Sequence, residues 1–251
     1  MKVFFVGGGP GDPELLTVKA LRLLRQCRCC IYAGSLVSPQ VLAHLPAGAA
    51  RYDSVTMTLE QIIAVCRRAQ QQEIDVVRLH SGDPSIYGAI GEQMLQLDKL
   101  GIAYEVVPGV SSFQAAAAAL KTELTAPEVS QTVILTRSAG RTPLPAEQEV
   151  DRLAASHATL CLFLSVQKLG ELVPALVRHY GADCPIGVVY RASWPDQKIV
   201  RGTLDDIVAK VAAEEISRTA MIIVGRALQP GAAVSRLYSD QFSHGYRQAT
   251  S

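Results

Sequence analysis

The chain has 251 residues, a length that suits one large domain or two small ones with a substantial buried core. Hydrophobic residues make up 49% and charged residues 19%, which is typical of a globular protein and excludes an intrinsically disordered one. The formal net charge of +1 argues against a protein that binds nucleic acid through an overall positive field, so we expect no nucleic-acid partner.

The first half of the chain alternates strand and helix patterns. Buried strands are expected at Lys2–Val6, Cys29–Ala33, Asp75–Leu79 and Tyr104–Val107. Helices are expected at Glu14–Gln26, Leu59–Gln71 and Ser85–Leu100. Because strands that alternate with helices form a parallel sheet with helices on both faces, we predict an α/β lobe over residues 1–113.

The second half starts after a helix and linker at residues 114–130. Strands are expected at Thr132–Thr136, Thr159–Leu164, Ile186–Tyr190, Lys198–Arg201 and Ala220–Val224, with a helix at Leu204–Glu214. Adjacent strands without an intervening helix predict a mixed sheet, in a second α/β lobe over residues 131–228. Residues 229–251 are polar and aperiodic, and we expect an extended tail there.

The cysteines and the N-terminus indicate the compartment. The six cysteines are interpreted as forming no Cys-x-x-Cys motif and have no His cluster beside them at zinc spacing, so we expect buried, reduced thiols and no protein-bound metal. The N-terminus has one Lys followed by a Gly/Pro turn, which is not the pattern of a signal peptide. No apolar run approaches the length that spans a bilayer. We therefore expect a cytoplasmic protein without a membrane partner.

A glycine-rich stretch, VGGGPGDP at Val6–Pro13, follows the first strand, where a dinucleotide-binding loop would lie. Its glycines do not fit G-x-G-x-x-G, because the third glycine would fall at Asp12 or at Glu14. The second strand also ends without the carboxylate that would hold a ribose, and the Gly-Lys-Ser/Thr of a P-loop is absent. A negative charge at the helix start would repel a pyrophosphate. We therefore predict that this stretch does not bind phosphates.

Three turns of similar build are expected at one edge of the sheet. Gly11–Pro13 and Gly82–Pro84 each lie between a strand and a helix, with Asp suited to the N-cap and Pro to the first helical position. A third turn, Pro108–Ser112, closes the next strand in the same orientation. The carboxyl edge of a parallel sheet is where ligands bind, and glycine lets the backbone approach a ligand closely. The pattern predicts a ligand site, with helix capping alone as the alternative for Asp12 and Asp83.

The stretches at these turns, VGGGPGDPELLTVKAL, VVRLHSGDPSIYG and VVPGVSSFQAAAAAL, resemble the tetrapyrrole methylase family. The resemblance implies a class III S-adenosylmethionine methyltransferase-like fold, with two α/β lobes, a ligand cleft between them, and a homodimer. Four further stretches resemble the branch that methylates precorrin-4 or cobalt-precorrin-4 at carbon 11 in cobalamin biosynthesis: YAGSLVS (Tyr32–Ser38), LTAPEVSQTVILTRSAGRTP (Leu124–Pro143), YRASWPDQKIVRGTL (Tyr190–Leu204) and SHGYR (Ser243–Arg247).

By this resemblance the chain uses S-adenosylmethionine as co-substrate and releases S-adenosylhomocysteine. In the first lobe, the expected cofactor-binding residues are Pro10, Ser81, Gly82, Asp83, Ile86, Tyr87, Ser111 and Ser112. From the second half of the chain, the expected contacts are Leu164, Ala192 and Met221.

The expected chemistry asks little of the side chains. The sulfonium already activates the methyl group, so the enzyme must mainly hold the carbon nucleophile, the methyl group and the sulfur in line. A carboxylate can stabilise positive charge on the macrocycle or take a proton, and Asp12 is the candidate; His80 is interpreted as structural. The tetrapyrrole substrate carries acetate and propionate groups, which call for arginine forks. The expected carboxylate-binding residues are Arg137, Arg141, Arg191 and Arg201.

Three alternatives stay open at this point. The chain could methylate another precorrin or uroporphyrinogen III within the same family. It could be an NAD-dependent oxidoreductase built on the glycine loop, although the missing third Gly and the missing strand-two acid count against this. It could also be a non-catalytic module that binds or senses a corrinoid, because the sequence identifies no indispensable catalytic side chain.

Overall fold

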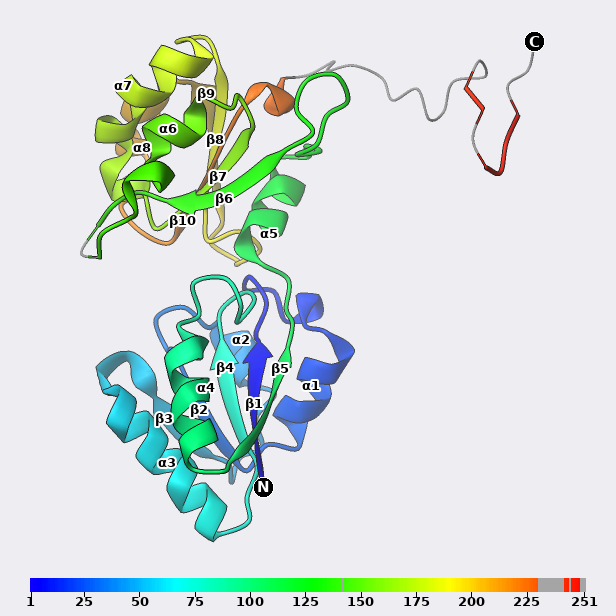
Figure 1. Ribbon diagram of the computed structural model, residues 1–251, viewed down its shortest axis with the longest axis vertical. Coiled ribbons are helices and arrows are strands. Elements are labelled where there is room, and N and C mark those ends of the chain that lie inside the picture. Colours follow the sequence, from blue (N-terminus) through cyan, green and yellow to red (C-terminus); the bar gives the residue numbers. More distant parts are fainter. Residues whose placement is uncertain (141, 230–241, 244, 249–251) are drawn as a thin grey trace. The chain divides into compact units, whose positions relative to one another are not determined.

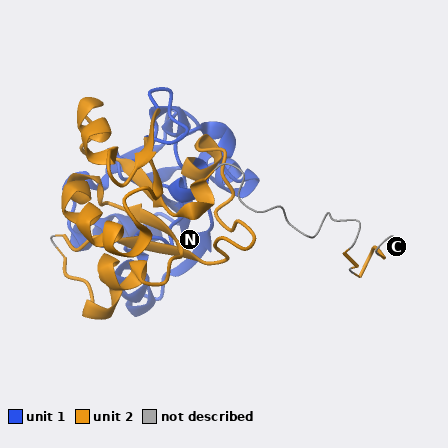
Figure 2. Cartoon of the chain, turned by 90° about the horizontal axis from the view of Figure 1, so that it is seen from above, with its two compact units in different colours: residues 1–115, 191–197 blue, residues 116–190, 198–251 orange. Residues whose placement is uncertain are grey.

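The computed structural model describes residues 1–140, 142–229, 242–243 and 245–248 (Figure 1). It divides into two compact units, residues 1–115 with 191–197 and residues 116–190 with 198–251, which Figure 2 shows in different colours. The division falls inside helix α5 (Ser112–Ala119), two residues beyond the expected end of the first lobe. Most of the expected polar tail lies outside the described residues.

The first unit contains a five-stranded parallel sheet in the order β3-β2-β4-β1-β5. Its strands are β1 (Lys2–Gly7), β2 (Cys29–Tyr32), β3 (Ala50–Asp53), β4 (Val76–His80) and β5 (Ala103–Val107). Val6 pairs with Leu79 of β4 and with Val107 of β5, so the three strands end at the same level. This register confirms the predicted parallel sheet and brings the turns that follow β1, β4 and β5 to one edge.

Helices cover both faces of this sheet, as predicted. They are α1 (Val18–Arg25), α2 (Pro39–Leu42), α3 (Leu59–Gln71) and α4 (Ile90–Lys99). On one face Val6 shares a core with Leu24 of α1. On the other face Phe5 shares a core with Ile62 of α3 and Leu97 of α4. Adjacent residues of β1 therefore serve opposite cores, because successive side chains of a strand alternate between its faces.

The first helix is shorter than predicted. Glu14 and Leu15 belong to a single 3-10 turn (Pro13–Leu15), and α1 begins only at Val18. The hydroxyl of Thr17 caps α1 by accepting a hydrogen bond from the backbone N–H of Ala20. The continuous helix expected at Glu14–Gln26 was thus wrong at its start, since it missed the second N-cap.

The second unit contains a five-stranded mixed sheet in the order β6-β7-β10-β8-β9. Its strands are β6 (Val133–Arg137), β7 (Thr159–Phe163), β8 (Pro185–Tyr190), β9 (Lys198–Thr203) and β10 (Ala220–Val224). Only β6 and β7 are parallel, while the other neighbouring pairs are antiparallel, which confirms the prediction of a mixed sheet. Residues of α6 (Val150–Ala154), α7 (Leu169–Tyr180) and α8 (Ile207–Ala213) form one core with this sheet.

All six cysteines are buried and free, as expected. Cys27 and Cys30 are three positions apart, which is a Cys-x-x-Cys spacing, so the interpretation that no such motif is present is wrong. Both thiols lie in the core between the sheet and α1. Across the described residues, no helix is both long and apolar enough to cross a membrane.

Candidate functional site

Three glycine turns meet at the carboxyl edge of the parallel sheet. Gly9 and Gly82 form an antiparallel bridge, with N–O distances of 3.3 and 2.8 Å for the two backbone hydrogen bonds. The backbone N–H of Gly8 donates to the carbonyl of His80 at 2.7 Å. The third turn joins them through the backbone N–H of Gly109, which donates to the Asp83 carboxylate at 2.8 Å. The predicted convergence of the three turns is confirmed.

The glycines are required because the turns pack backbone against backbone. A Cβ on Gly109 would lie 2.3 Å from the carbonyl oxygen of Gly82 and 2.8 Å from the Cα of Gly7. A Cβ on Gly7 would lie 2.6 Å from the Cα of Gly109. Gly82 has a φ of 63°, which glycine adopts without a steric penalty. The turns at this edge therefore pack main chain directly against main chain.

The two aspartates of these turns cap them in different ways. Asp12 Oδ1 accepts a hydrogen bond from the backbone N–H of Glu14 at 2.9 Å, and so caps the 3-10 turn as predicted. Asp83 Oδ1 accepts from the backbone N–H of Ser85 at 2.8 Å and from its hydroxyl, while Oδ2 accepts from Gly109. Partial burial of Asp83 opposes ionisation, but these hydrogen bonds outweigh it and lower the pKa of the carboxyl. Asp83 is thus ionised, and both of its carboxylate oxygens accept hydrogen bonds.

The second turn is a loop rather than the start of a helix. Tyr87 and Ala89 have φ values of 55° and 49°, which lie outside the right-handed helical region, so α4 starts at Ile90 and not at Ser85. Gln93 of α4 fixes the end of this loop, because its Nε2 donates to the carbonyl of Ala89 at 3.0 Å. The Tyr87 side chain is 47% exposed at this edge, where a cofactor contact was predicted.

Beneath the second turn, β4 buries two basic side chains. The guanidinium of Arg78 donates through Nε to Gln93 Oε1 at 3.1 Å. His80 is 6% exposed, and its Nε2 has no hydrogen-bond partner among the described residues. Burial, assisted by the positive charge of Arg78, lowers the pKa of His80 to about 3. His80 is therefore a neutral imidazole, in keeping with the structural role expected of it.

A segment from the second half of the chain belongs to the first unit. Residues 191–197, between β8 and β9, have the colour of the first unit in Figure 2, and two of them contact the first glycine turn. The Ser193 hydroxyl accepts from the backbone N–H of Asp12 at 3.0 Å, and the indole of Trp194 donates to the Pro10 carbonyl at 2.8 Å. The structure thus brings Ala192, an expected cofactor contact, into the same unit as Pro10. Sequence reasoning missed Ser193 and Trp194, because contacts across more than 180 residues leave no local pattern.

The other residues expected at the site differ in their environment. Ser111 is buried and Ser112 begins α5, next to Gly82, whose added Cβ would lie 3.5 Å from the Cα of Ser111. In the second unit Leu164 is 74% exposed with a φ of 52°, whereas Met221 is buried within β10. Contact of these residues with a cofactor stays a prediction.

The expected arginines make contacts of their own. Arg137 donates to the carbonyls of Ser138, Thr142 and Pro143 at 3.1–3.2 Å. Arg201 donates to the Leu120 carbonyl at 2.5 Å, and Arg191 pairs with Asp196 at 2.6 Å. Arg141 lies outside the described residues. Carboxylate binding by these residues stays a prediction.

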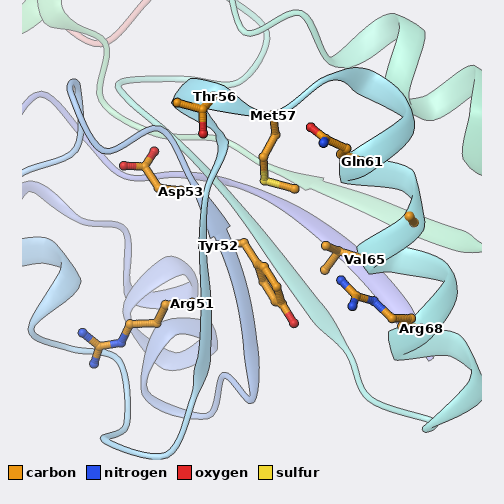
Figure 3. A pocket seen from close by; sticks show the side chains of 9 residues that line it. Arg51, Tyr52, Asp53, Thr56, Met57, Gln61, Val65 and Arg68 are labelled. Carbon is orange, nitrogen blue, oxygen red and sulfur yellow. The ribbon is translucent and has the colours of Figure 1, made fainter.

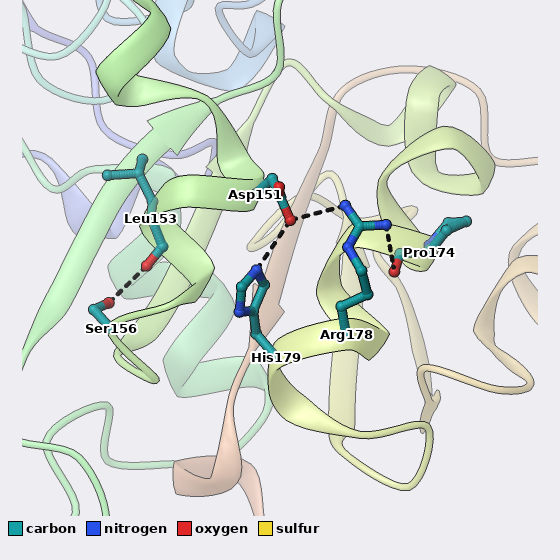
Figure 4. A network of polar contacts seen from close by, with 6 residues as sticks. All are labelled: Asp151, Leu153, Ser156, Pro174, Arg178 and His179. Atoms are coloured by element: carbon teal, nitrogen blue, oxygen red, sulfur yellow. Dashed lines mark hydrogen bonds and ion pairs between the residues drawn. The ribbon is translucent and has the colours of Figure 1, made fainter.

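Two other features of the described surface involve none of the expected site residues. A hollow of about 690 Å³ lies between β3, the turn after it and α3, lined by Tyr52, Met57 and Arg68 among others (Figure 3). In the second unit Asp151 Oδ1 accepts from Arg178 and lies 3.0 Å from His179 Nε2 (Figure 4). Ser156 is not part of that pair, since its hydroxyl donates to the Leu153 carbonyl. The Asp–His pair therefore lacks the serine that a hydrolytic triad needs.

Comparison with known proteins identifies the relatives of this chain. The family model described as Tetrapyrrole (Corrin/Porphyrin) Methylases matches residues 2–208. The precorrin-4 C(11)-methyltransferase of Pseudomonas aeruginosa is 52% identical over 98% of this chain and 99% of its own length. The cobalt-precorrin-4 C(11)-methyltransferase of Methanocaldococcus jannaschii is 51% identical over 99% of this chain and 96% of its own.

Solved structures agree with these matches. The X-ray structure of a cobalamin biosynthetic enzyme, cobalt precorrin-4 methyltransferase, superposes with a TM-score of 0.89 at 43% identity, covering 91% of this chain and 96% of that one. The uroporphyrin-III C-methyltransferase of Thermus thermophilus, complexed with S-adenosylhomocysteine, superposes with a TM-score of 0.77 at 30% identity, covering 91% and 94%. The fold of two sheets described above is therefore that of known methyltransferases.

Proposed function

The chain belongs to the tetrapyrrole (corrin/porphyrin) methylases, and from that premise we propose that it methylates precorrin-4 or cobalt-precorrin-4 at carbon 11, with S-adenosylmethionine as the methyl donor. The product is precorrin-5 or its cobalt form, within cobalamin biosynthesis. The convergence of the Gly7–Pro13, His80–Ala89 and Pro108–Ser112 turns at one edge of the sheet carries the proposal. Family membership sets aside the oxidoreductase alternative.

The carboxyl edge fits a co-substrate that is held largely by backbone groups. Gly109 leaves no room for a side chain and Gly82 has a φ of 63° that favours glycine, while Ser81, Asp83 and Tyr87 are partly exposed beside them. When bound, S-adenosylmethionine supplies a methyl group that its sulfonium already activates for displacement. The chain's own task is then to hold the reacting atoms in line, which alone supplies several kcal/mol of catalysis. The proposed contacts are Pro10, Ser81, Gly82, Asp83, Ile86, Tyr87, Ser111, Ser112, Leu164, Ala192 and Met221.

Asp12 is the proposed catalytic carboxylate. Its Oδ1 caps the 3-10 turn, while Oδ2 has no hydrogen-bond partner among the described residues. The backbone N–H of Asp12 is held by Ser193, so the carboxylate projects from a fixed turn. We assign to Oδ2 the stabilisation of positive charge on the macrocycle, or the removal of a proton from it.

The arginines are proposed to hold the acidic rim of the macrocycle. Arg137 and Arg201 now donate to main-chain carbonyls, and Arg191 to Asp196. A substrate carboxylate can replace a carbonyl acceptor, because a bidentate pair between a guanidinium and a negatively charged carboxylate is stronger than hydrogen bonds from the guanidinium to neutral carbonyls. Arg141 is proposed alongside them on the resemblance alone.

We further propose a homodimer that works in the cytoplasm. The resemblance supports the dimer, and the six free, buried thiols are compatible with a reducing compartment. Light scattering on the eluted peak of a gel-filtration column gives the mass directly, and a monomer mass contradicts the dimer.

The test is incubation of the purified protein with isotope-labelled S-adenosylmethionine and with precorrin-4, in metal-free and cobalt forms. Nearly equal identities to the two named relatives leave the preferred form open, so both substrates are needed. NMR of the product locates the new methyl group, and transfer to carbon 11 supports the proposal. Transfer only to another precorrin or to uroporphyrinogen III would mean that the chain methylates a different substrate of the same family. Binding of a corrinoid without turnover indicates the sensing alternative.

A further inference from the structure

The only tryptophan of the chain lies against the first glycine turn. The Nε1 of Trp194 donates to the Pro10 carbonyl at 2.8 Å, and the neighbouring Ser193 hydroxyl accepts from the N–H of Asp12 at 3.0 Å. Between these two anchors lies Gly11, on which a Cβ would come within 2.1 Å of the indole Cδ1. Each of the three consecutive residues of the turn from Pro10 to Asp12 is thus in contact with Ser193 or Trp194.

Residues 191–197, which make these contacts, are also held together by contacts among themselves. The Arg191 guanidinium lies 4.8 Å from the centre of the Trp194 ring and pairs with Asp196 at 2.6 Å. The backbone N–H of Ser193 donates to Gln197 Oε1 at 2.7 Å, and that of Trp194 to the Arg191 carbonyl at 2.9 Å. Cation–π contact and ion pairing on one guanidinium fix the plane of the indole. The indole therefore meets the turn in a preset orientation.

We propose that Trp194 is a positioning residue for methyl transfer, acting through the backbone of Pro10–Asp12 on the cofactor contact and on the Asp12 carboxylate. The inference rests on the proposed function of this edge. Catalysis by alignment is sensitive to displacements of about 1 Å, so a turn held by two hydrogen bonds and a close ring contact matters more for turnover than for binding.

The informative variant is Trp194→Phe, which keeps a ring against Gly11 and Arg191 but removes the N–H that holds Pro10. Loss of one such hydrogen bond is expected to lower kcat about fivefold, with KM for the macrocycle nearly unchanged. Trp194→Ala, which also removes the ring, is expected to lower kcat more. Ser156→Ala is the matched control, because its hydroxyl also bonds a backbone carbonyl but lies in the second unit.

Calorimetric titration with S-adenosylhomocysteine comes first, and kcat is expressed per binding site so that misfolded protein does not count. No binding by the wild-type protein overturns the proposed function itself. Binding by wild type, with an unchanged kcat per site in Trp194→Phe, overturns the positioning role alone. A fall in kcat per site in Trp194→Phe but not in Ser156→Ala supports it.

A second readout uses the single tryptophan as its own probe. All tryptophan emission of the chain comes from Trp194, whose indole N–H is bonded to an expected cofactor contact. Saturation with S-adenosylhomocysteine is expected to change the intensity or wavelength of this emission. An unchanged spectrum, at a concentration where calorimetry shows full occupancy, contradicts the link between Trp194 and the cofactor.

Discussion

The carboxylate of Asp83 accepts the backbone N–H of Gly109 at 2.8 Å, and so ties the turn after β4 to the turn after β5. Its other oxygen holds the backbone N–H of Ser85 at 2.8 Å. One side chain therefore fixes two of the three turns that form the candidate site. The motif Gly-Asp-Pro is more than a helix cap here, since no helix follows it directly.

Replacing Asp83 with Asn should weaken cofactor binding. The amide offers only one acceptor oxygen and no charge, so either Ser85 or Gly109 loses its partner. Hydrogen bonds to charged groups contribute more than neutral ones, and we expect affinity for S-adenosylhomocysteine to fall about tenfold. Calorimetric titration of Asp83→Asn against wild type measures this directly.

Asp53→Asn is the matched control for that variant. Asp53 ends β3 on the same sheet and also accepts two backbone N–H groups, from Gly34 and Val55, each at 3.0 Å. Both hydrogen bonds fall on Oδ1, an acceptor that Asn keeps, so this variant loses only the charge. It should lower the thermal midpoint only slightly and leave the affinity for S-adenosylhomocysteine unchanged. Equal losses of affinity in the two variants would mean that Asp83 acts only through general stability.

Gly109→Ala should destabilise the first unit. The added Cβ meets the Gly82 carbonyl oxygen at 2.3 Å, a backbone atom that cannot move aside without breaking the bridge to Gly9. Overpacking of this kind costs about 1–3 kcal/mol of unfolding free energy. Gly91→Ala is the control, because its Cβ has open space in the first turn of α4 and alanine favours a helix by about 0.5–1 kcal/mol. Urea unfolding curves should therefore move in opposite directions for the two variants.

The parallel sheet could be predicted because its strands are apolar runs between turn signals, as at Val76–His80, where every residue is buried. Helix α7 was missed, since Gly170 and Pro174 lower the helical propensity of its sequence. Tertiary packing overrides this, because Leu169, Leu176 and Tyr180 enter the core of the second sheet. Strand β3 was missed for the opposite reason, as an edge strand with mostly exposed residues has no apolar pattern.

The candidate site could also be predicted only in part. The glycine turns could be predicted, because parallel topology brings consecutive strand ends to one edge. The left-handed residues Tyr87 and Ala89 could not, since their sequence reads as a helix start. The contact between Trp194 and Pro10 could not be predicted from local sequence patterns, because only the folded chain brings the two residues together.

Among the cysteines, Cys27 should react first with an alkylating agent. A hydrogen bond from the Cys30 thiol outweighs burial and lowers the pKa of the Cys27 thiol, with help from the backbone N–H groups of Cys29 and Val77. Burial raises the pKa of Cys29 to about 11 and that of Cys66 to about 12. Cys27 and Cys29 are equally buried, at 5% and 6% exposure, so mass spectrometry after treatment with iodoacetamide should find more label on Cys27 than on Cys29.

Cys30→Ala tests the cause of that reactivity. Without the Cys30 thiol the pKa of Cys27 should rise and its labelling should slow, whereas Cys184→Ala should leave it unchanged. Burial also raises the pKa of Cys184, to about 11, and its neighbours are in the second unit. Labelling of Cys27 at the same rate in both variants would show that exposure, and not the thiol hydrogen bond, controls the reaction.

His80 should make the stability of the protein depend on pH between the pKa of an unfolded histidine and its own. Burial, and then the charge of Arg78, lower its pKa to about 3, against about 6.5 in an unfolded chain. Between these values the unfolded state binds a proton that the folded state does not, so stability rises with pH and is lost as pH falls. One proton corresponds to about 1.4 kcal/mol per pH unit. From pH about 6 to about 4.5 His80 should add nearly that slope to the loss of unfolding free energy that the carboxylates begin to cause at the lower end of the range. His80→Asn removes the titrating group and should flatten the curve in this range, whatever its effect on stability at neutral pH. An equally steep curve in the variant would show that other groups cause the pH dependence and that His80 does not titrate in this range.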